Sequence, residues 1–351
     1  MFYESVTYRE NLNNALHAIC NNRDLYGKRF LISGASGLIG SFIIDMLAFA
    51  NEVEDAGIEI WALGRDESKL RERFHSNISS GHLNFIIQDI TDKFVCDIEF
   101  DYIINLAGDG YPAAFRERPV ETMTPAFVGT YNLLEHVVKT GKGRVLLASS
   151  GEVYGTIENR QAFVENDCGY IDSMSSRSCY PIAKKAAETL CASYAKEYDV
   201  YVMVARLSHV YGANSSPKDN RATVQFMQNA IKKEDIVLHS LGNQMRSYTY
   251  VADAVVGLFY ILLRGNKGEA YNVANAESRI TIADFAKETA KIGGVKCVRK
   301  MEDDITRAEK TPIEYAVLDS SKLEKLGYKA EYTPSEGIRD SLKILEEISK
   351  R

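Results

Sequence analysis

The fold class follows from residues 29–40, which read RFLISGASGLIG. The run from Phe30 to Ile32 is short and apolar, as in a buried strand. Glycines follow at positions 34, 37 and 40, and residues 42–50 then form an apolar stretch of helical length. A strand, a glycine turn and a helix in this order predict the first unit of a parallel α/β fold.

The three glycines have a spacing typical of a dinucleotide-binding turn. The first glycine permits the tight turn, the second lets the backbone approach a pyrophosphate, and the third allows the helix to pack closely. The N-terminus of that helix attracts the anion. A glycine-rich turn without a ligand is the alternative, but the position between a strand and a helix favours a cofactor site. The residues expected to line the site at this turn are Gly34, Ser36, Gly37, Leu38, Ile39 and Gly40.

The alternation of strands and helices continues to about residue 207, which predicts a Rossmann-type, doubly wound parallel sheet. Beyond that point the pattern is less regular, so we expect a smaller C-terminal α/β domain for the substrate. Leu12, Leu16 and Ile19 lie at helical spacing and predict an extra helix before the main fold. The expected divisions are a helical extension over 1–27, a cofactor-binding domain over 28–211 together with 243–265, and a substrate domain over 212–242 and 266–351.

Composition excludes several classes of function. The formal net charge of -6, with no basic run, gives no general attraction to nucleic acid or anionic membranes. The six cysteines form no C-x-x-C pair, which argues against structural zinc, and we expect no metal site. The N-terminal segment lacks the layout of a signal peptide and no long apolar run occurs, so a cytoplasmic protein is expected.

The choice between NAD and NADP depends on the end of the second strand. NAD enzymes usually place an acidic residue there to hold the ribose hydroxyls, whereas this strand ends in Gly64 and Arg65. The arginine could accept a 2'-phosphate and favour NADP, or it could be an ordinary surface residue. Asp89 and Ile90, after the third strand, are expected near the adenine. Leu106, Ala107 and Gly108, after the fourth strand, are also assigned to the cofactor site.

A tyrosine and a lysine four residues apart form the candidate catalytic pair. Tyr180 and Lys184 share one face if Tyr180 lies near the start of a helix. The ammonium and a bound nicotinamide would lower the pKa of the phenol, which could then act as a base. Ser150 follows the fifth strand and could orient a substrate hydroxyl. Glu152 is either an ordinary loop carboxylate or a second base.

The sequence resembles the extended short-chain dehydrogenase/reductase family, in its NAD-dependent epimerase/dehydratase group. The resemblance covers nearly the whole chain from residue 29. The motifs that carry it are the glycine triplet, Asn105-Leu106-Ala107, Ser150-Gly151-Glu152-Val153-Tyr154-Gly155, Tyr180 with Lys184, residues 246–253 (RSYTYVAD) and residues 318–323 (LDSSKL). Within the group, Arg177-Ser178-Cys179-Tyr180 and residues 186–190 (AAETL) look most like UDP-glucuronate decarboxylases, and nucleotide-sugar 4,6-dehydratases are also similar.

The resemblance implies an enzyme that oxidises a nucleotide-diphosphate sugar at C4, with NAD or NADP tightly bound and recycled. Tyr180 would be the base, Lys184 would hold the phenolate, Ser150 would orient the hydroxyl and Glu152 would act on the keto sugar. The residues assigned to the substrate are Ser150, Gly151, Glu152, His209 and Arg246. A homodimer formed through the helix that carries Tyr180 is also implied.

Three departures leave the exact reaction open. Gly151 stands where the 4,6-dehydratases have Asp or Ser and the decarboxylases have Ser, and the missing Asp argues against a simple glucose 4,6-dehydratase. His209 stands where relatives have Asn, and Ala126 where Asn often supports the cofactor side. A 4-epimerase or a keto-sugar reductase is the alternative enzyme. A cofactor-binding protein without catalysis is the alternative of another class.

Overall fold

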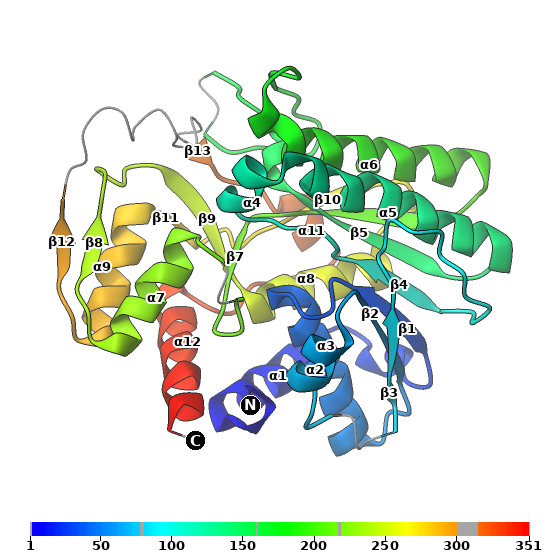
Figure 1. The fold of residues 1–351 in the computed structure, drawn as a ribbon, viewed down its shortest axis with the longest axis horizontal. Helices are drawn as coiled ribbons and strands as arrows, with labels where there is room; N and C mark the ends of the chain where they lie inside the picture. Colours follow the sequence, from blue (N-terminus) through cyan, green and yellow to red (C-terminus); the bar gives the residue numbers. More distant parts are fainter. Residues whose placement is uncertain (1, 78–80, 159–160, 217–218, 301–314, 351) are drawn as a thin grey trace.

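The computed structural model describes residues 2–77, 81–158, 161–216, 219–300 and 315–350. A central sheet of seven parallel strands has the order β10-β6-β5-β4-β1-β2-β3 (Figure 1). The chain adds β2 and β3 on one side of β1 and then crosses over to add β4, β5 and β6 on the other side. This order confirms the doubly wound fold predicted from the sequence. The strands of the sheet are β1 (Arg29–Ser33), β2 (Glu59–Gly64), β3 (Leu83–Ile87), β4 (Tyr102–Asn105), β5 (Arg144–Ser150), β6 (Tyr201–Leu207) and β10 (Ala270–Val273).

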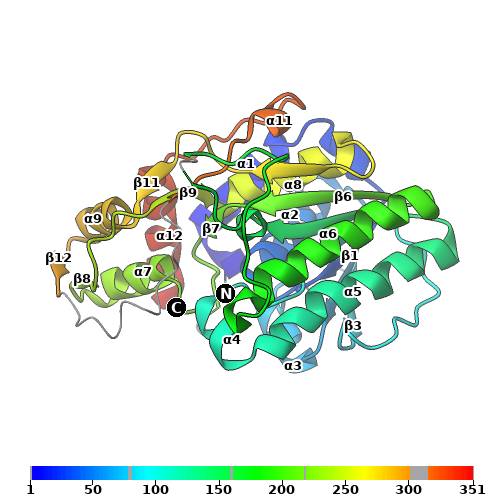
Figure 2. The same cartoon turned by 90° about the horizontal axis from the view of Figure 1, so that it is seen from above.

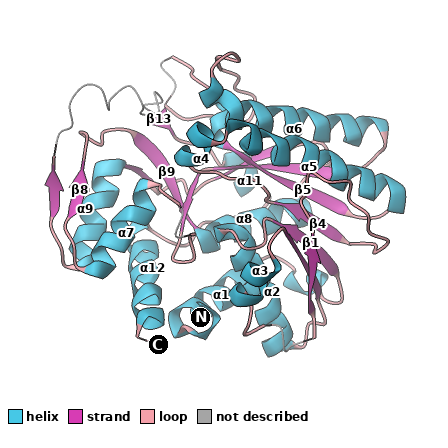
Figure 3. Cartoon of the chain, viewed as in Figure 1, coloured by secondary structure: helices cyan, strands magenta, loops and turns pink. Residues whose placement is uncertain are grey.

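Helices cover both faces of this sheet, as Figure 3 shows by colouring helices and strands separately. The two long helices α5 and α6 pack against each other on one face, and Figure 2 shows them side by side. Helices α2 and α8 lie on the other face. The bounds are α2 (Leu38–Glu54), α3 (Glu67–Arg73), α4 (Pro112–Glu117), α5 (Pro119–Thr140), α6 (Cys179–Glu197) and α8 (Val251–Arg264). In the part of the chain that the structure describes, no helix is both long and apolar enough to cross a membrane.

A smaller lobe follows the sheet in the sequence and contains short strands and helices. Its larger sheet pairs β9 with β7, β11 and β13, and β8 pairs with β12 beside it. The strands are β7 (His209–Tyr211), β8 (Ile236–Leu238), β9 (Met245–Tyr250), β11 (Arg279–Thr281), β12 (Cys297–Arg299) and β13 (Tyr315–Ala316). The helices are α7 (Ala222–Lys232), α9 (Ile282–Gly293), α11 (Ser321–Glu324) and α12 (Pro334–Ser349).

One strand corrects the expected division of the chain. β10 falls within 266–351, which the sequence assigned to the substrate domain, yet it pairs in parallel with β6 at the edge of the central sheet. The chain therefore returns to the cofactor-binding sheet after the second lobe has begun. Residues 301–314 of the same expected range lie outside the described residues.

The N-terminal extension forms helix α1 (Val6–Ala18), which contacts α2, α8 and α12 and so touches both lobes. Tyr8 donates a hydrogen bond to buried Asp45 of α2 at 2.9 Å. Asn11 donates to Asp340 of α12 at 2.8 Å, and Ser5 donates to Glu347 at 2.6 Å. The first and last helices therefore lie side by side (Figure 1).

Candidate active site

The glycine turn has little room for any side chain larger than hydrogen. Gly34 has a φ of +64°, and a Cβ there would lie 2.6 Å from the carbonyl oxygen of Leu106. A Cβ at Gly40 would lie 2.5 Å from the carbonyl oxygen of Gly34. Gly37 is the N-cap of α2, so the positive end of the helix points to the carboxyl end of the sheet. Ser36, Leu38 and Ile39 are only partly buried beside it, and this surface fits a dinucleotide pyrophosphate.

The ends of β1 and β4 are tied together next to this turn. Ser33 donates a hydrogen bond to the side chain of Asn105 at 2.7 Å. The backbone N–H groups of Leu106 and Ala107 donate to the hydroxyl of Ser33 at 3.1 and 3.3 Å. Gly108 follows with a φ of +128°. These contacts hold the segment assigned to the cofactor directly beside Gly34.

The residues expected near the adenine form an ion pair. Arg65 lies 3.3 Å from Asp89, and the Arg65 side chain is 68% exposed. Desolvation alone would raise the pKa of Asp89, but hydrogen bonds from Thr91 and the charge of Arg65 lower it below its ordinary value. Ile90 is buried against Gly129 of α5 and presents little surface. The charge of Arg65 is therefore already balanced in this structure.

Tyr180 and Lys184 lie one turn apart near the start of α6. Ser150, the last residue of β5, lies near enough to the Tyr180 hydroxyl to act on it and lower its pKa. The ammonium of Lys184 donates to the carbonyl oxygen of Ala148 at 2.7 Å. Strand β5 thus positions both members of the pair, and the three side chains expected to act on the C4 hydroxyl come together.

The protein around the pair shifts both pKa values toward the neutral forms. Desolvation and then the negative charge of Glu152 raise the pKa of Tyr180 to about 12. Desolvation lowers the pKa of Lys184 to about 8, although the charge of Glu188 acts in the opposite direction. A phenolate at neutral pH therefore needs an additional positive charge nearby, which an oxidised nicotinamide supplies.

We expect turnover to decline as the pH rises above about 8, because Lys184 then loses the charge that stabilises the phenolate. The measurement is kcat from about pH 6 to 10. The variant Lys184→Arg stays charged over this range, so its activity, even if lower, should show no such decline. The same decline in both proteins would contradict this assignment.

Glu152 is not isolated but clamped by an arginine. Arg177 makes two parallel contacts with the Glu152 carboxylate, at 3.1 and 3.2 Å. The guanidinium also lies 4.9 Å from the ring centre of Phe115, and this ring stacks on Tyr180 at 4.6 Å. Before the structure was known, Arg177 stood out only as part of the motif Arg177-Ser178-Cys179-Tyr180. No sequence pattern indicated a role for Phe115.

Gly151 has little space beside it for a side chain, because Leu318 packs closely against it. A Cβ on Gly151 would lie 3.1 Å from a methyl group of Leu318. Leu318 is buried with Val153 and Tyr154 in a small apolar cluster. The side of the site next to Gly151 is therefore apolar and offers no proton donor from this residue.

Positive charge gathers where the second lobe meets the site. Arg246 of β9 is buried, and His209 of β7 is exposed but close to it in the same small sheet. The surrounding protein and then the charges of Arg246 and Arg221 lower the pKa of His209 below its ordinary value, so the imidazole is neutral at pH 7. Arg221 precedes α7 and pairs with Asp219 at 2.6 Å. Sequence reasoning missed Arg221 because it lies in no recognised motif, yet its charge also acts on Tyr180.

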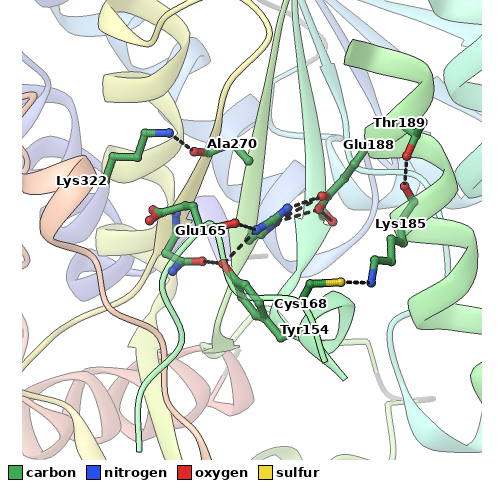
Figure 4. Close-up of polar contacts among 11 residues, drawn as sticks. Tyr154, Glu165, Cys168, Lys185, Glu188, Thr189, Ala270 and Lys322 are labelled. Atoms are coloured by element: carbon green, nitrogen blue, oxygen red, sulfur yellow. Dashed lines mark hydrogen bonds and ion pairs between the residues drawn. The ribbon is translucent and has the colours of Figure 1, made fainter. Parts of the chain in front are cut away.

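A polar network joins β6 to α6, and Figure 4 shows its contacts around Tyr154, Glu165 and Glu188. Arg206 of β6 pairs with Glu188 of α6 at 2.7 Å, and Ser149 of β5 donates to the same carboxylate. Arg206 also donates to the hydroxyl of Tyr154 at 3.1 Å and to the carbonyl oxygen of Glu165 at 2.7 Å. The network therefore fixes the end of β5, from which Ser150 reaches Tyr180.

No metal centre accompanies these groups in the described ranges, where no three His, Cys, Asp or Glu side chains are placed to share an ion. A glycine turn at a helix N-terminus together with a Ser, Tyr and Lys set defines a nicotinamide-dependent enzyme. Residues 30–274 match the model of the NAD dependent epimerase/dehydratase family. The chain belongs to this family and is an NAD-dependent enzyme of the epimerase/dehydratase class.

Similar proteins agree with this assignment. UDP-glucuronic acid decarboxylase 3 of Arabidopsis thaliana is 30% identical over 323 residues, which are 91% of this chain and 88% of the relative. UDP-glucuronic acid decarboxylase 1 of Danio rerio is 32% identical over 264 residues, 74% of this chain and 59% of the relative. UDP-glucuronic acid 4-epimerase of Bacillus cereus, solved with NAD, has a TM-score of 0.77 at 20% identity and covers 91% of this chain and 99% of its own. This last likeness shows the fold.

Proposed function

We propose that the protein is an NAD-dependent decarboxylase of a nucleotide-linked uronic acid, with UDP-glucuronate as the first candidate substrate. The observation that carries the proposal is Gly151 with Leu318 packed behind it. Dehydration at C6 needs an acid to protonate the departing hydroxyl, and residue 151 supplies none. Loss of carbon dioxide from C5 needs no acid at that position. The two decarboxylases described above support the same choice.

The side chains of the site perform the first step by moving one proton. Tyr180 accepts the proton of the C4 hydroxyl while Ser150 orients that hydroxyl and Lys184 stabilises the phenolate. A nicotinamide held beside the turn of Gly34, Gly37 and Gly40 would supply the hydride acceptor for C4 and, at the end of the cycle, the hydride donor. The resulting C4 ketone stabilises the electron pair left on C5 when carbon dioxide departs. A proton from solvent then adds to C5, which gives the 4-keto pentose. Tyr180 then returns its proton to the C4 oxygen, which leaves the tyrosine ready for another cycle.

The test is to incubate the protein with UDP-glucuronate, UDP-glucose and dTDP-glucose and to determine the product masses. We expect loss of carbon dioxide from UDP-glucuronate and no change in the neutral sugars. Loss of water would show a dehydratase, and an unchanged mass with altered stereochemistry would show an epimerase. A reductase would release oxidised cofactor in proportion to product.

We propose NAD as the cofactor, tightly bound and recycled. The argument for NADP rested on Arg65, and Asp89 already pairs with that guanidinium. A 2'-phosphate would have to compete with this carboxylate. Denaturing the purified protein and identifying the released nucleotide by mass tests this proposal, and NADP would contradict it.

We also propose that the protein is a homodimer formed through α6, the helix that carries Tyr180, together with α5, which packs beside it. We propose further that it works in a reducing compartment such as the cytoplasm. The six cysteines are all free thiols, which supports the proposal of a reducing compartment.

Exposed apolar side chains follow one face of α5, which is typical of an interface. They are Val120 (67% exposed), Met123 (37%), Phe127 (42%), Tyr131 (44%) and Val138 (38%).

If the exposed apolar face of α5 forms the dimer interface, Phe127→Glu should separate the subunits. The substitution would bury an unpaired charge at the centre of that interface. Light scattering should show a dimer for the original protein and a monomer for the variant. Val95→Glu is the matched control, since Val95 is 73% exposed outside α5. An original protein that is monomeric at micromolar concentration would overturn this proposal.

A further inference from the structure

Arg177 has no part in the proton transfers described above, although it lies inside the site. It belongs to a short 3-10 turn (Ser176–Ser178) that leads directly into α6 and Tyr180. Its side chain is 39% exposed, so a ligand can reach the guanidinium. Phe115 contacts both this guanidinium and the ring of Tyr180, which keeps the two groups close together.

The guanidinium faces a carboxylate in the arrangement that favours carboxylate recognition. Two of its nitrogens contact the two oxygens of Glu152, at 3.1 and 3.2 Å. Such a paired contact orients a planar carboxylate and is stronger than a single hydrogen bond. The same pair of N–H groups cannot hold two carboxylates at once. A second carboxylate that enters the site must therefore compete with Glu152.

A uronic acid brings such a carboxylate to this place. If the C4 hydroxyl lies at Tyr180 and Ser150, the C5 substituent is the next group along the sugar ring. Phe115 lies against both the Arg177 guanidinium and the ring of Tyr180, which places the ion pair on the side of the site where that substituent would lie. Glu152 alone would repel a sugar carboxylate, whereas Arg177 would attract it.

We propose that Arg177 is the residue that selects a carboxylated sugar, by exchanging the Glu152 carboxylate for that of the substrate. The inference rests on the proposed function, because it takes a uronic acid as the ligand. While the substrate is bound, the guanidinium fork holds the carboxylate beside the C4 hydroxyl. When carbon dioxide leaves, the fork returns to Glu152, and the site regains the ion pair seen here.

The test compares the binding of UDP-glucuronate and UDP-glucose, which differ only in the group at C6. Calorimetry is done on the NAD-loaded protein carrying Tyr180→Phe, so that no turnover occurs. Adding Arg177→Gln should weaken UDP-glucuronate binding by about 10- to 100-fold, the range expected for a lost charge-assisted pair, and leave UDP-glucose unchanged. Adding Glu152→Gln instead should tighten UDP-glucuronate binding, because the competing carboxylate is gone.

Arg71→Gln is the matched control, since Arg71 forms an exposed pair with Glu67 on α3 and should affect neither ligand. If Arg177→Gln does not fold, Arg177→Lys keeps the charge without the planar fork and should weaken UDP-glucuronate binding to a smaller degree. Equal weakening of both sugars, or no tightening with Glu152→Gln, would overturn the exchange. The proposed function fails separately, if the original protein releases no carbon dioxide from UDP-glucuronate.

Discussion

Replacing Tyr180 by Phe should lower kcat by about 10³-fold, because the hydroxyl that exchanges the C4 proton is lost. The ring would keep its stacking on Phe115, so the shape of the site should not change. We therefore expect the variant to retain the nucleotide that purifies with it. The measurements are the rate of product formation and the amount of nucleotide released on denaturation.

A matched control separates the loss of this hydroxyl from the loss of any tyrosine hydroxyl on the same helix. Tyr198 lies at the C-terminal end of α6 and is 49% exposed. Tyr198→Phe should keep the original rate. Full activity in Tyr180→Phe would remove the assigned base and with it the proposed chemistry.

Arg206→Met should lower the free energy of unfolding by about 3–5 kcal/mol, because it leaves the buried carboxylate of Glu188 without its partner. The side chains of Arg206 and Glu188 are only 14% and 10% exposed, so water cannot replace the lost contacts well. Arg206 also donates to Tyr154 and Glu165, and the substitution removes these bonds too. Urea denaturation followed by fluorescence measures the change.

The double variant Arg206→Met, Glu188→Leu is the control for this stability prediction. Replacing both charges by apolar groups removes the unpaired carboxylate, so much of the lost stability should return. A loss below about 1 kcal/mol in the single variant would mean that the pair behaves as a surface ion pair. The network would then not be needed to hold the end of β5.

Local sequence patterns were sufficient to predict the central fold and the placement of Tyr180 and Lys184 on one turn of a helix. The glycine turn depends on contacts within a few residues, and Tyr180 and Lys184 need only one helical turn to share a face. Leu106, which the sequence places at the end of the fourth strand, has its carbonyl oxygen against Gly34. These features come from strand and helix signals that adjoin each other in the chain.

Contacts between distant segments could not be predicted in the same way. Phe115 of α4 stacks on Tyr180, and Arg221, which precedes α7, acts on Tyr180 through its charge. Neither residue lies in a motif. β10 is a short strand whose place in the central sheet depends on pairing with β6, far earlier in the chain. Such positions are set by tertiary packing, which overrides short patterns.

The extension before the fold shows both situations within one helix. The spacing of Leu12 and Leu16 predicted a helix, and the structure confirms it. Both side chains are fully buried on one face of α1. Its contacts with α12 could not be predicted, since Asn11 and Asp340 belong to opposite ends of the chain. Helix α1 therefore contacts helices of both lobes.

The central claim is that the enzyme removes the C6 carboxylate through a C4 ketone, and one labelling experiment tests it most directly. UDP-glucuronate carrying ¹³C at C6 is incubated with the protein as purified, without added cofactor. We predict ¹³C-labelled carbon dioxide and an unlabelled UDP-pentose, formed over many turnovers per enzyme. The claim would be contradicted if no labelled carbon dioxide were released and the label stayed in the nucleotide sugar, whether that sugar had kept its mass or had lost water.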